Sequence, residues 1–570
     1  MRFHALAVDF DGTLAHDSRV AEQALEALRA LRKSGRRSIL ATGRILDDLR
    51  GVYKNLELFD AVVAENGAVL FDPASGKTEL LAPPPSEKFV EALRARGVAP
   101  LEVGHVIVAT WQPHEAAVLE TIRELGLDLT VIFNKGAVMV LPSGINKATG
   151  LEKQLEAFKL SFHNVAGIGD AENDLRFLER CEASAAVSNA LDSVKEQCDL
   201  VMEGDHGHGV RQFIEQIIED DLASQSERID RRHRIALGKL QDGVLDVSVA
   251  CRGVLIAGTS GGGKSTMASA IIERVAEGGY QYTILDPEGD FSDLEGAIAV
   301  GDAESEPNLA TVSDVITSGQ NSVISLVAIK VDDRAVQARQ LLSRIAELRA
   351  RFGRPHWLII DEAHHFFPAA AKSSSDSLEP CLGVLYTTTE PQLVATEALR
   401  CVDVVIAMGE EPRATIDAAR KQLGIEGSIG GASVPKKLRR GEALVWRRSD
   451  PETLAHIETI AGKSERRRHA RKYAKGELAE EKSFYFTGPK RKLNLRAQNL
   501  FTFVQMAEGV DDETWTYHLK RHDYSGWVRE MIGDDDLAAE FRATESERKL
   551  SPSEGRKRIA EAVRERYTVG

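Results

Sequence analysis

The stretch GTSGGGKST at residues 258–266 is the strongest indication of fold in the middle of this 570-residue chain. It lies inside RGVLIAGTSGGGKSTMASAIIERV, where an apolar strand, a glycine-rich loop and a helix follow one another. Backbone N–H groups of such a loop and of the helix N-terminus bind phosphates. The sequence therefore predicts a nucleoside triphosphate site formed by Gly258, Thr259, Ser260, Gly261, Gly262, Gly263, Lys264, Ser265 and Thr266.

A carboxylate pair completes this predicted site. In RPHWLIIDEAHHF an apolar run ends at Asp361 and Glu362. We expect Lys264 to reach the β- and γ-phosphates, and Ser265 and Asp361 to hold Mg²⁺. Glu362 is then placed to activate a water for ATP hydrolysis, a group that a small-molecule kinase does not need. The two following histidines either cap the strand end or contact the nucleotide.

A second predicted site lies near the N-terminus, in the string VDFDGTL at residues 8–14. Asp9 and Asp11 are two residues apart at the end of a strand, so they point to the same side of the sheet. Later strand ends carry Thr42, Lys147, Asp170, Asn173 and Asp174. Carboxylates, a hydroxyl and an ammonium group at one sheet edge are what phosphoryl transfer through an aspartyl intermediate needs, with Mg²⁺ as cofactor.

Residues 1–220 resemble the haloacid dehalogenase (HAD) superfamily, and the strings ATGR and ENGA with a mid-domain insert resemble its Cof-type branch. The resemblance implies Asp9 as nucleophile and Asp11 as general acid/base. It also implies phosphate binding by Thr42 and Lys147, and Mg²⁺ binding by Asp170 and Asp174, with Asp9 and the backbone carbonyl of Asp11. We add Asn173 to the phosphate-binding set. Glu65 and Asn66 either form a turn or contact the substrate.

Residues 235–455 resemble the HerA/FtsK group of ring-forming, DNA-pumping ATPases, and HerA most. The resemblance rests on IALGKLQDGVLDVSV, LDPEGDF, DEAHHF, TTTEPQ and LRRGEALVW. It implies a hexamer with ATP bound between subunits, and a γ-phosphate sensor at Thr388, Thr389 or Gln392. The stretch 366–392 contains no arginine to bridge subunits. Arg400, Arg439 and Arg440 are substitutes to test. The N-terminal small barrel of HerA is also absent, and the phosphatase stands in its place.

The C-terminal region differs in composition. Residues 461–500 contain 12 Lys or Arg against 4 Asp or Glu, interleaved with Tyr473, Phe484, Tyr485 and Phe486. This pattern fits a nucleic-acid contact. The alternative that we favour is a solvated helix followed by one buried strand, SFYFTG. Further helical patterns run to residue 570.

Bulk composition limits the classes of function. The net charge of −15 argues against general coating of nucleic acid or anionic membrane, although it allows a local basic channel. The five cysteines form no Cys-x-x-Cys pair, which suggests reduced thiols. We find no signal region and no apolar run long enough to span a membrane, so we expect a soluble cytoplasmic protein.

The expected fold class is α/β, with two Rossmann-like parallel-sheet domains and a helical C-terminal module. We expect a HAD phosphatase at 1–220 (core 1–82 and 145–220, cap 83–144), a linker at 221–234, a RecA-like P-loop ATPase at 235–460, and the basic segment and module at 461–570. The expected partners are a phosphorylated substrate, ATP, DNA and further copies of the chain. The first hypothesis is a phosphatase joined to an ATPase that acts on nucleic acid. The alternatives are a sugar-phosphate or phosphoglycolate-type phosphatase with a regulatory ATPase, and a polynucleotide kinase–phosphatase.

Overall fold

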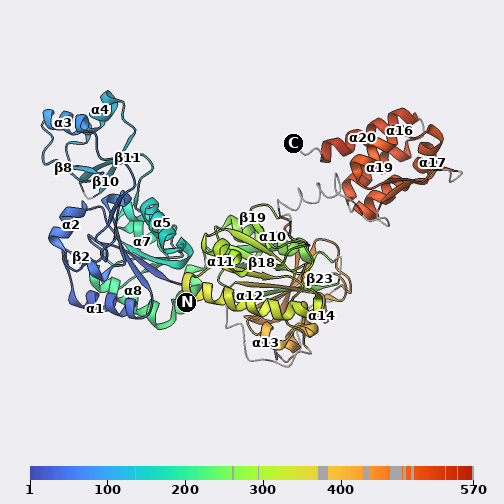
Figure 1. Cartoon of the computed structure of the whole chain (residues 1–570), viewed down its shortest axis with the longest axis horizontal. Coiled ribbons are helices and arrows are strands. Elements are labelled where there is room, and N and C mark those ends of the chain that lie inside the picture. Colours follow the sequence, from blue (N-terminus) through green and yellow to red (C-terminus); the bar gives the residue numbers. More distant parts are fainter. Residues whose placement is uncertain are drawn as a thin grey trace. The chain divides into compact units, whose positions relative to one another are not determined.

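The computed structural model describes residues 1–134, 136–259, 262–292, 294–369, 383–425, 427, 435–462, 478, 483–489, 493–532, 534–547 and 550–567. The chain divides into two compact units, of which the first holds residues 1–268 and 274–459 and the second 269–273 and 460–570. Figure 1 colours the chain from blue at the N-terminus to red at the C-terminus. The α/β class with an added helical module is confirmed.

The N-terminal part of the first unit is an eight-stranded sheet in the order β14-β13-β12-β1-β4-β5-β6-β7. The strands from β14 to β5 are parallel, and β6 and β7 are antiparallel additions. Because the central strands are buried on both faces, they read as continuous apolar runs. Their bounds are β1 Ala5–Asp9, β4 Arg37–Ala41, β5 Ala61–Ala64, β6 Val69–Phe71, β7 Thr78–Leu80, β12 Val165–Gly169, β13 Ala183–Ala186 and β14 Leu200–Val201.

Helices cover this sheet and share its core. Leu25, Leu28 and Leu31 of one helix recur at helical spacing and are buried against the strands. The helices are α1 Glu22–Lys33, α2 Leu46–Val52, α5 Lys147–Phe158, α6 Glu172–Leu178, α7 Asp192–Gln197 and α8 His206–Asp220.

A small α+β cap interrupts this domain between β7 and α5 (Figure 1). Its antiparallel sheet has the order β10-β11-β9-β8 and packs on two helices. The buried residues Phe89, Leu93, Val118 and Val140 belong to a core of its own. The elements are α3 Glu87–Ala95, β8 Glu102–Val103, β9 Val108–Trp111, α4 Glu115–Leu125, β10 Leu129–Asn134 and β11 Ala137–Pro142.

The polar segment 221–234 is folded. It contains the short helices η4 (Ala223–Gln225) and α9 (Ser226–Ile229), and Ile229 is fully buried. Arg232 forms an ion pair with Asp199 at 2.6 Å. The segment is therefore packed on the phosphatase sheet.

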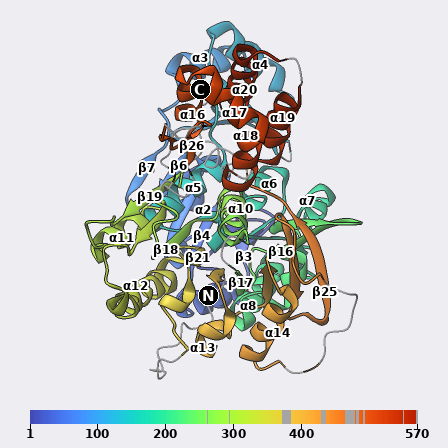
Figure 2. The same ribbon diagram turned by 90° about the vertical axis from the view of Figure 1, so that its right-hand side faces the viewer.

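The second domain of this unit is an eleven-stranded sheet in the order β16-β15-β25-β24-β23-β17-β22-β21-β18-β20-β19. The strands from β23 to β19 are parallel, and β16, β15, β25 and β24 extend them antiparallel. Figure 2 shows the long strand β25. The bounds are β15 Arg234–Leu240, β16 Gly243–Ser248, β17 Gly253–Gly258, β18 Tyr282–Asp286, β19 Ala297–Val300, β20 Asn321–Ser325, β21 Trp357–Ile360, β22 Val384–Thr388, β23 Val404–Met408, β24 Glu442–Arg447 and β25 Asp450–Thr459.

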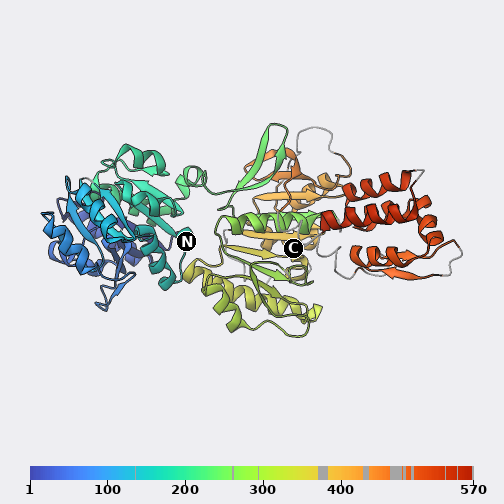
Figure 3. The same cartoon turned by 90° about the horizontal axis from the view of Figure 1, so that it is seen from above.

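Helices lie on both faces of this sheet. One helix (α10, Lys264–Glu277) follows the glycine-rich loop, and Figures 1 and 3 show it in green beside the strands. Ile316, Leu342 and Ile416 belong to a core that covers the opposite face. They come from α11 (Leu309–Thr317), α12 (Val331–Phe352) and α14 (Pro412–Gln422), and α13 spans Thr396–Leu399.

The second unit is a helical module with one hairpin, β26 (Phe484–Phe486) and β27 (Leu495–Ala497). Phe484 and Phe486 are buried in its core, and Tyr485 is half-buried. These two phenylalanines are thus unavailable for stacking on bases. Most of the basic stretch, including Tyr473, lies outside the described residues. The helices are α16 Leu500–Gly509, α17 Asp512–Arg521, α18 Asp523–Trp527, α19 Asp535–Ser546 and α20 Pro552–Tyr567.

Among the described residues, none of the helices combines the length and apolar character that crossing a membrane requires.

Candidate active sites

The first candidate site is a buried cluster of charges at the carboxyl ends of β1 and β12. Asp9 ends β1, Asp170 follows β12, and Asp174 lies in α6. Lys147 at the start of α5 donates to Asp9 Oδ1 and to Asp174 Oδ1, both at 2.6 Å. The structure therefore brings together four side chains that are up to 165 residues apart in the sequence.

The position of Lys147 depends on a close approach between two backbones. Asn146 caps α5 by accepting from the N–H groups of Ala148 and Thr149. Gly67 has φ +100, and a Cβ there would lie 2.0 Å from the carbonyl oxygen of Asn146. Only glycine fits this contact, so the ENG turn fixes the helix that presents Lys147.

Electrostatics in this cluster favour a cation. Burial raises the pKa of Asp9 well above its ordinary value, and the Asp174 carboxylate raises it further, against the opposing effect of Lys147. Burial lowers the pKa of Lys147, but Asp174 and Asp9 raise it more, so the net shift is upward. Carboxylate oxygens of Asp9, Asp170 and Asp174 lie within 4.8 Å of one another. Three buried carboxylates against one ammonium leave negative charge that a hard divalent cation such as Mg²⁺ fits.

The remaining predicted residues of this site lie around the cluster. Thr42 follows β4, is fully buried, and accepts from the Arg44 backbone N–H through Oγ1. Asn173 donates to Asn66 Oδ1 at 3.3 Å. Thr13, for which the sequence predicted no role, donates to Asp170 Oδ1 at 3.1 Å.

Asp11 has a partner that the sequence reasoning missed. It is exposed, and Arg44 donates to both of its carboxylate oxygens at 2.7 Å. Such a bidentate pair fixes the orientation of a carboxylate. Arg44 is the last residue of the string ATGR. A positive charge after this strand end could have indicated a partner for the expected acid/base carboxylate of Asp11.

Glu65 joins the core to the cap. Its carboxylate is fully buried and accepts from the backbone N–H groups of His105, Val106 and Ile107 at 2.8–3.1 Å. Asn66 donates to Met139 Sδ in the cap at 3.0 Å. Of the two alternatives for Glu65, this geometry favours the structural one.

We expect Glu65→Gln to weaken the contact between the core and the cap. The amide N–H groups of the glutamine would face the backbone N–H groups of residues 105–107, which now donate to the Glu65 carboxylate. Hydrogen exchange at residues 105–107 should accelerate roughly 10- to 100-fold, which corresponds to about 1.5–3 kcal/mol for hydrogen bonds to a charged group. Mass-spectrometric exchange measures this. The matched control is Glu79→Gln, because the Glu79 side chain is 60% exposed. Equal exchange in both variants would contradict the assignment.

The second candidate site lies at the carboxyl end of β17, which is flanked by β22 and β23. Gly258 has φ +149, and a Cβ there would lie 2.0 Å from the carbonyl oxygen of Met408. The loop can therefore leave the strand only through glycine. Lys264 and the exposed Ser265 begin α10, whereas Ser260 and Gly261 lie outside the described residues.

Lys264 faces the second acidic element. Its Nζ lies 3.8 Å from Glu362 Oε1, and Glu362 Oε2 lies 3.4 Å from His364 Nδ1. Glu362 also has φ +45, a conformation that is rare outside glycine. Burial raises its pKa, and the Lys264 charge opposes that rise. A strained, partly desolvated carboxylate beside the loop lysine suits a group that acts on water.

Asp361 is held by a hydroxyl that the sequence reasoning missed. Thr387 Oγ1 donates to Asp361 Oδ1 at 2.6 Å and accepts from the Glu362 backbone N–H at 2.9 Å. Burial raises the pKa of Asp361 to about 7, although the Thr387 hydrogen bond lowers it. Thr387 is the first residue of the TTTEPQ string, in which the sequence predicted a role only for Thr388, Thr389 or Gln392.

The other predicted residues of this site are spread more widely. Thr388 is fully buried at the end of β22, and its Oγ1 lies 3.2 Å from His364 Nδ1. Thr389 is half-buried and Gln392 is exposed in the short helix Pro391–Leu393. Arg400, Arg439 and Arg440 are all exposed.

Comparison with known proteins agrees with this division of the chain. The haloacid dehalogenase-like hydrolase family matches residues 6–97 and 102–214. The family described as the central domain of helicase HerA matches residues 235–350.

Individual relatives match the N-terminal part. A phosphoglycolate phosphatase of Methanothermobacter thermautotrophicus is 31% identical over 218 residues, 37% of this chain and 96% of that protein. One of Methanosarcina acetivorans is 30% identical over 229 residues, 38% of this chain and 96% of that protein. A solved haloacid dehalogenase-like hydrolase of Bacteroides thetaiotaomicron covers 38% of this chain and 99% of its own, with 20% identity and a TM-score of 0.34. The chain thus belongs to the haloacid dehalogenase-like hydrolases and joins their phosphatase domain to an ATPase domain of the HerA type.

Proposed function

We propose that this chain is a Mg²⁺-dependent phosphomonoester hydrolase fused to a ring-forming ATPase that acts on nucleic acid. The observation that carries the phosphatase half is the buried contact of Lys147 with both Asp9 and Asp174. A lysine between the carboxylate that ends β1 and a carboxylate of α6 is suited to hold a phosphoryl group beside a nucleophile. The cytoplasm is the proposed compartment, in line with the reduced thiols of Cys181, Cys198 and Cys251.

In the phosphatase half, Asp9 attacks the phosphorus atom and the leaving group departs with a proton from Asp11. Arg44 orients Asp11, while Thr42, Lys147 and Asn173 bind the phosphoryl oxygens. The carboxylates of Asp9, Asp170 and Asp174, with the backbone carbonyl of Asp11, would hold Mg²⁺, which neutralises charge on those oxygens. Asp11 then removes a proton from the water that releases Asp9.

In the ATPase half, the loop of residues 258–266 binds the phosphates of ATP, with Lys264 on the β- and γ-phosphates. Ser265 and Asp361 would hold the Mg²⁺ that accompanies ATP. Glu362 orients and deprotonates the attacking water. Thr388, Thr389 or Gln392 senses the γ-phosphate. The 3.8 Å between Lys264 and Glu362 supports this assignment, because the water must lie between the γ-phosphate and the base.

We expect the full-length protein to form a closed ring, most simply a hexamer, because HerA-type domains suggest assembly through ATP sites. Light scattering with MgATP should give the mass of six chains. One of Arg400, Arg439 and Arg440 would complete the neighbouring ATP site, and its change to Ala should reduce turnover without weakening ATP binding. A monomer with full ATPase activity would refute the ring.

A second candidate function has a specific observation in its favour. The relatives matched by the N-terminal domain are named phosphoglycolate phosphatases. A small phosphorylated carboxylic acid could therefore be the substrate, with the ATPase serving assembly or regulation. The kinase–phosphatase alternative is weakened by Glu362, whose carboxylate faces the loop lysine.

The experiment that separates these functions has two arms. ATP turnover is measured with and without single- and double-stranded DNA, and phosphate release is measured across phosphorylated metabolites and oligonucleotide ends. Stimulation by DNA of at least about 10-fold supports the nucleic-acid function. Unchanged turnover, with phosphoglycolate as the preferred substrate, supports the metabolic one. ATP-dependent labelling of a 5′-hydroxyl end would instead establish the kinase.

A further inference from the structure

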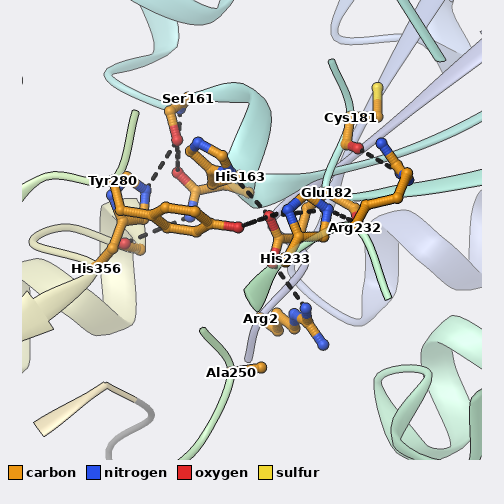
Figure 4. Close-up of polar contacts among 12 residues, drawn as sticks. Arg2, Ser161, His163, Cys181, Glu182, Arg232, His233, Ala250, Tyr280 and His356 are labelled. Atoms are coloured by element: carbon orange, nitrogen blue, oxygen red, sulfur yellow. Dashed lines mark hydrogen bonds and ion pairs between the residues drawn. The ribbon is translucent and has the colours of Figure 1, made fainter. Parts of the chain in front are cut away.

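A further polar cluster lies in the first unit and contains none of the residues of the two candidate active sites. Figure 4 shows its side chains. His163 and Glu182 come from the phosphatase domain, Tyr280 comes from the ATPase domain, and His233 directly precedes β15. His163, Glu182 and Tyr280 lie near the N-terminal ends of β12, β13 and β18. The candidate active sites lie at the carboxyl ends of strands, so neither of them uses this cluster.

Three side chains of the cluster approach one carboxylate oxygen. Glu182 Oε2 lies 2.8 Å from His163 Nδ1, 2.7 Å from Tyr280 Oη and 3.8 Å from His233 Nε2. The Tyr280 hydroxyl also lies 3.0 Å from His233 Nδ1. One ligand atom from each of His163, Glu182 and His233 can be chosen so that all three lie within 4.8 Å of one another.

The cluster has one hydrogen-bond acceptor more than its donors can satisfy when His233 is neutral. His233 Nε2 lies 3.1 Å from the carbonyl oxygen of Glu182, which can only accept, so Nε2 carries the hydrogen. In a neutral ring Nδ1 is then an acceptor. Its neighbour, the Tyr280 hydroxyl, has one hydrogen to share between Nδ1 and Glu182 Oε2. One lone pair therefore has no donor unless His233 takes up a proton or a metal ion joins the group.

The surroundings match those of a metal ligand set. Ligating histidines usually donate their second N–H to a carbonyl, as His233 does here, and ligating carboxylates accept outer hydrogen bonds. Arg2 donates at 2.7 Å to Glu182 Oε1, the oxygen that faces away from the cluster, and at 3.0 Å to Asp230. The side chains of His163, Glu182 and His233 are 14%, 3% and 11% exposed, which shields a site without sealing it.

A nearby histidine shows the contrast. His356 Nδ1 accepts from the Gln281 backbone N–H at 2.8 Å, and its Nε2 lies 2.9 Å from the Ser161 hydroxyl. Both of its nitrogens are thus used by single, well-matched partners (Figure 4). The contested proton is confined to the group around Glu182.

We propose that His163, Glu182 and His233 bind a first-row transition-metal ion of the zinc class, with the Tyr280 oxygen in the fourth position. His163 and His233 coordinate through Nδ1 and Glu182 through Oε2. His163 moves its proton to Nε2, and the phenolic proton of Tyr280 leaves to solvent. The four ligand atoms then share one ion, which removes the conflict over the shared proton.

Ligand chemistry selects this class of metal over Mg²⁺. Two imidazoles with one carboxylate suit zinc, whereas Mg²⁺ takes oxygen ligands. Bonds of about 2.0–2.2 Å in a tetrahedron place ligand atoms roughly 3.3 Å apart. Three pairs of the proposed ligand atoms are now 2.7–3.0 Å apart and would move outward slightly around an ion. An ion here would link the phosphatase domain to the ATPase domain through Tyr280.

The test uses full-length protein without a histidine tag, dialysed against buffer with Zn²⁺ and then without it. Elemental analysis should give one Zn²⁺ per chain, unaffected by excess Mg²⁺. Replacement by Co²⁺ should give visible absorption typical of tetrahedral nitrogen and oxygen ligation. His233→Ala and Glu182→Gln should lower Zn²⁺ affinity by roughly 100-fold or more.

Two further variants keep the test decisive. The control His16→Ala/His206→Ala removes a histidine pair outside the cluster, with ring nitrogens 3.1 Å apart, and it should keep its Zn²⁺. If His233→Ala fails to fold by circular dichroism, Tyr280→Phe serves instead and should alter the Co²⁺ spectrum. Wild-type protein without stoichiometric Zn²⁺ would overturn the proposal and assign the contested lone pair to a protonated His233. Loss of Zn²⁺ from the control variant alone would overturn it as well.

Discussion

Asp9→Asn should abolish release of phosphate from p-nitrophenyl phosphate in the presence of Mg²⁺, by roughly 10³-fold or more. A neutral amide cannot act as the covalent nucleophile. The amide also removes one of the two carboxylates that Lys147 contacts at 2.6 Å, while the contact with Asp174 persists. The fold should therefore survive the change. Initial rates of phosphate release, with ATP turnover measured in parallel, give the result.

The matched control for this variant is Asp17→Asn. The Asp17 side chain is 89% exposed and makes only a long contact with His16 among the contacts described. Its amide should leave both activities near those of the unmodified protein. Near-normal phosphatase activity in Asp9→Asn would show that the first site is assigned wrongly.

Glu362→Gln should separate ATP binding from ATP cleavage. Lys264 and Ser265 bind the phosphates and their Mg²⁺, whereas Glu362 acts on water. Glutamine keeps the size of the side chain but loses its basicity. We expect near-normal ATP affinity and turnover reduced by roughly 10²-fold or more. Equilibrium binding of a fluorescent ATP analogue and steady-state phosphate release measure the two effects.

Two further variants bracket this result. Lys264→Ala should weaken binding itself, because it removes the charge that contacts the phosphates. Glu347→Gln should change neither quantity, because its side chain is 63% exposed on α12. Undiminished hydrolysis in Glu362→Gln would reject the ATPase mechanism and reopen the kinase alternative.

The sequence predicted the fold class and the two groups of motif residues, because local chemistry dictates them. VDFDGTL and GIGDAENDL each end a buried strand, so their carboxylates had to lie at one edge of a parallel sheet. The structure brings Asp9, Asp170 and Asp174 together in that way. The glycines of the phosphate loop likewise follow from backbone geometry at Gly258.

Other features were out of reach because they depend on packing between distant segments. No pattern near Glu65 indicates that its carboxylate accepts three N–H groups from residues 105–107. Thr387 was quoted within a motif, but its contact with Asp361 follows from the register of β22 beside β21. The cluster around Glu182 joins residues from three parts of the chain. The polar composition of the segment 221–234 indicated a linker and did not show that the segment packs on the sheet.

In the proposed function, one chain carries two separate hydrolytic sites. The most direct measurement is the rate of phosphate release from p-nitrophenyl phosphate and from ATP by the unmodified protein, Asp9→Asn, Glu362→Gln and the double variant. We predict that Asp9→Asn abolishes phosphate release from p-nitrophenyl phosphate only and that Glu362→Gln abolishes release from ATP only. The double variant should release phosphate from neither substrate. Loss of ATP hydrolysis in Asp9→Asn, with p-nitrophenyl phosphate release unchanged, would contradict the account.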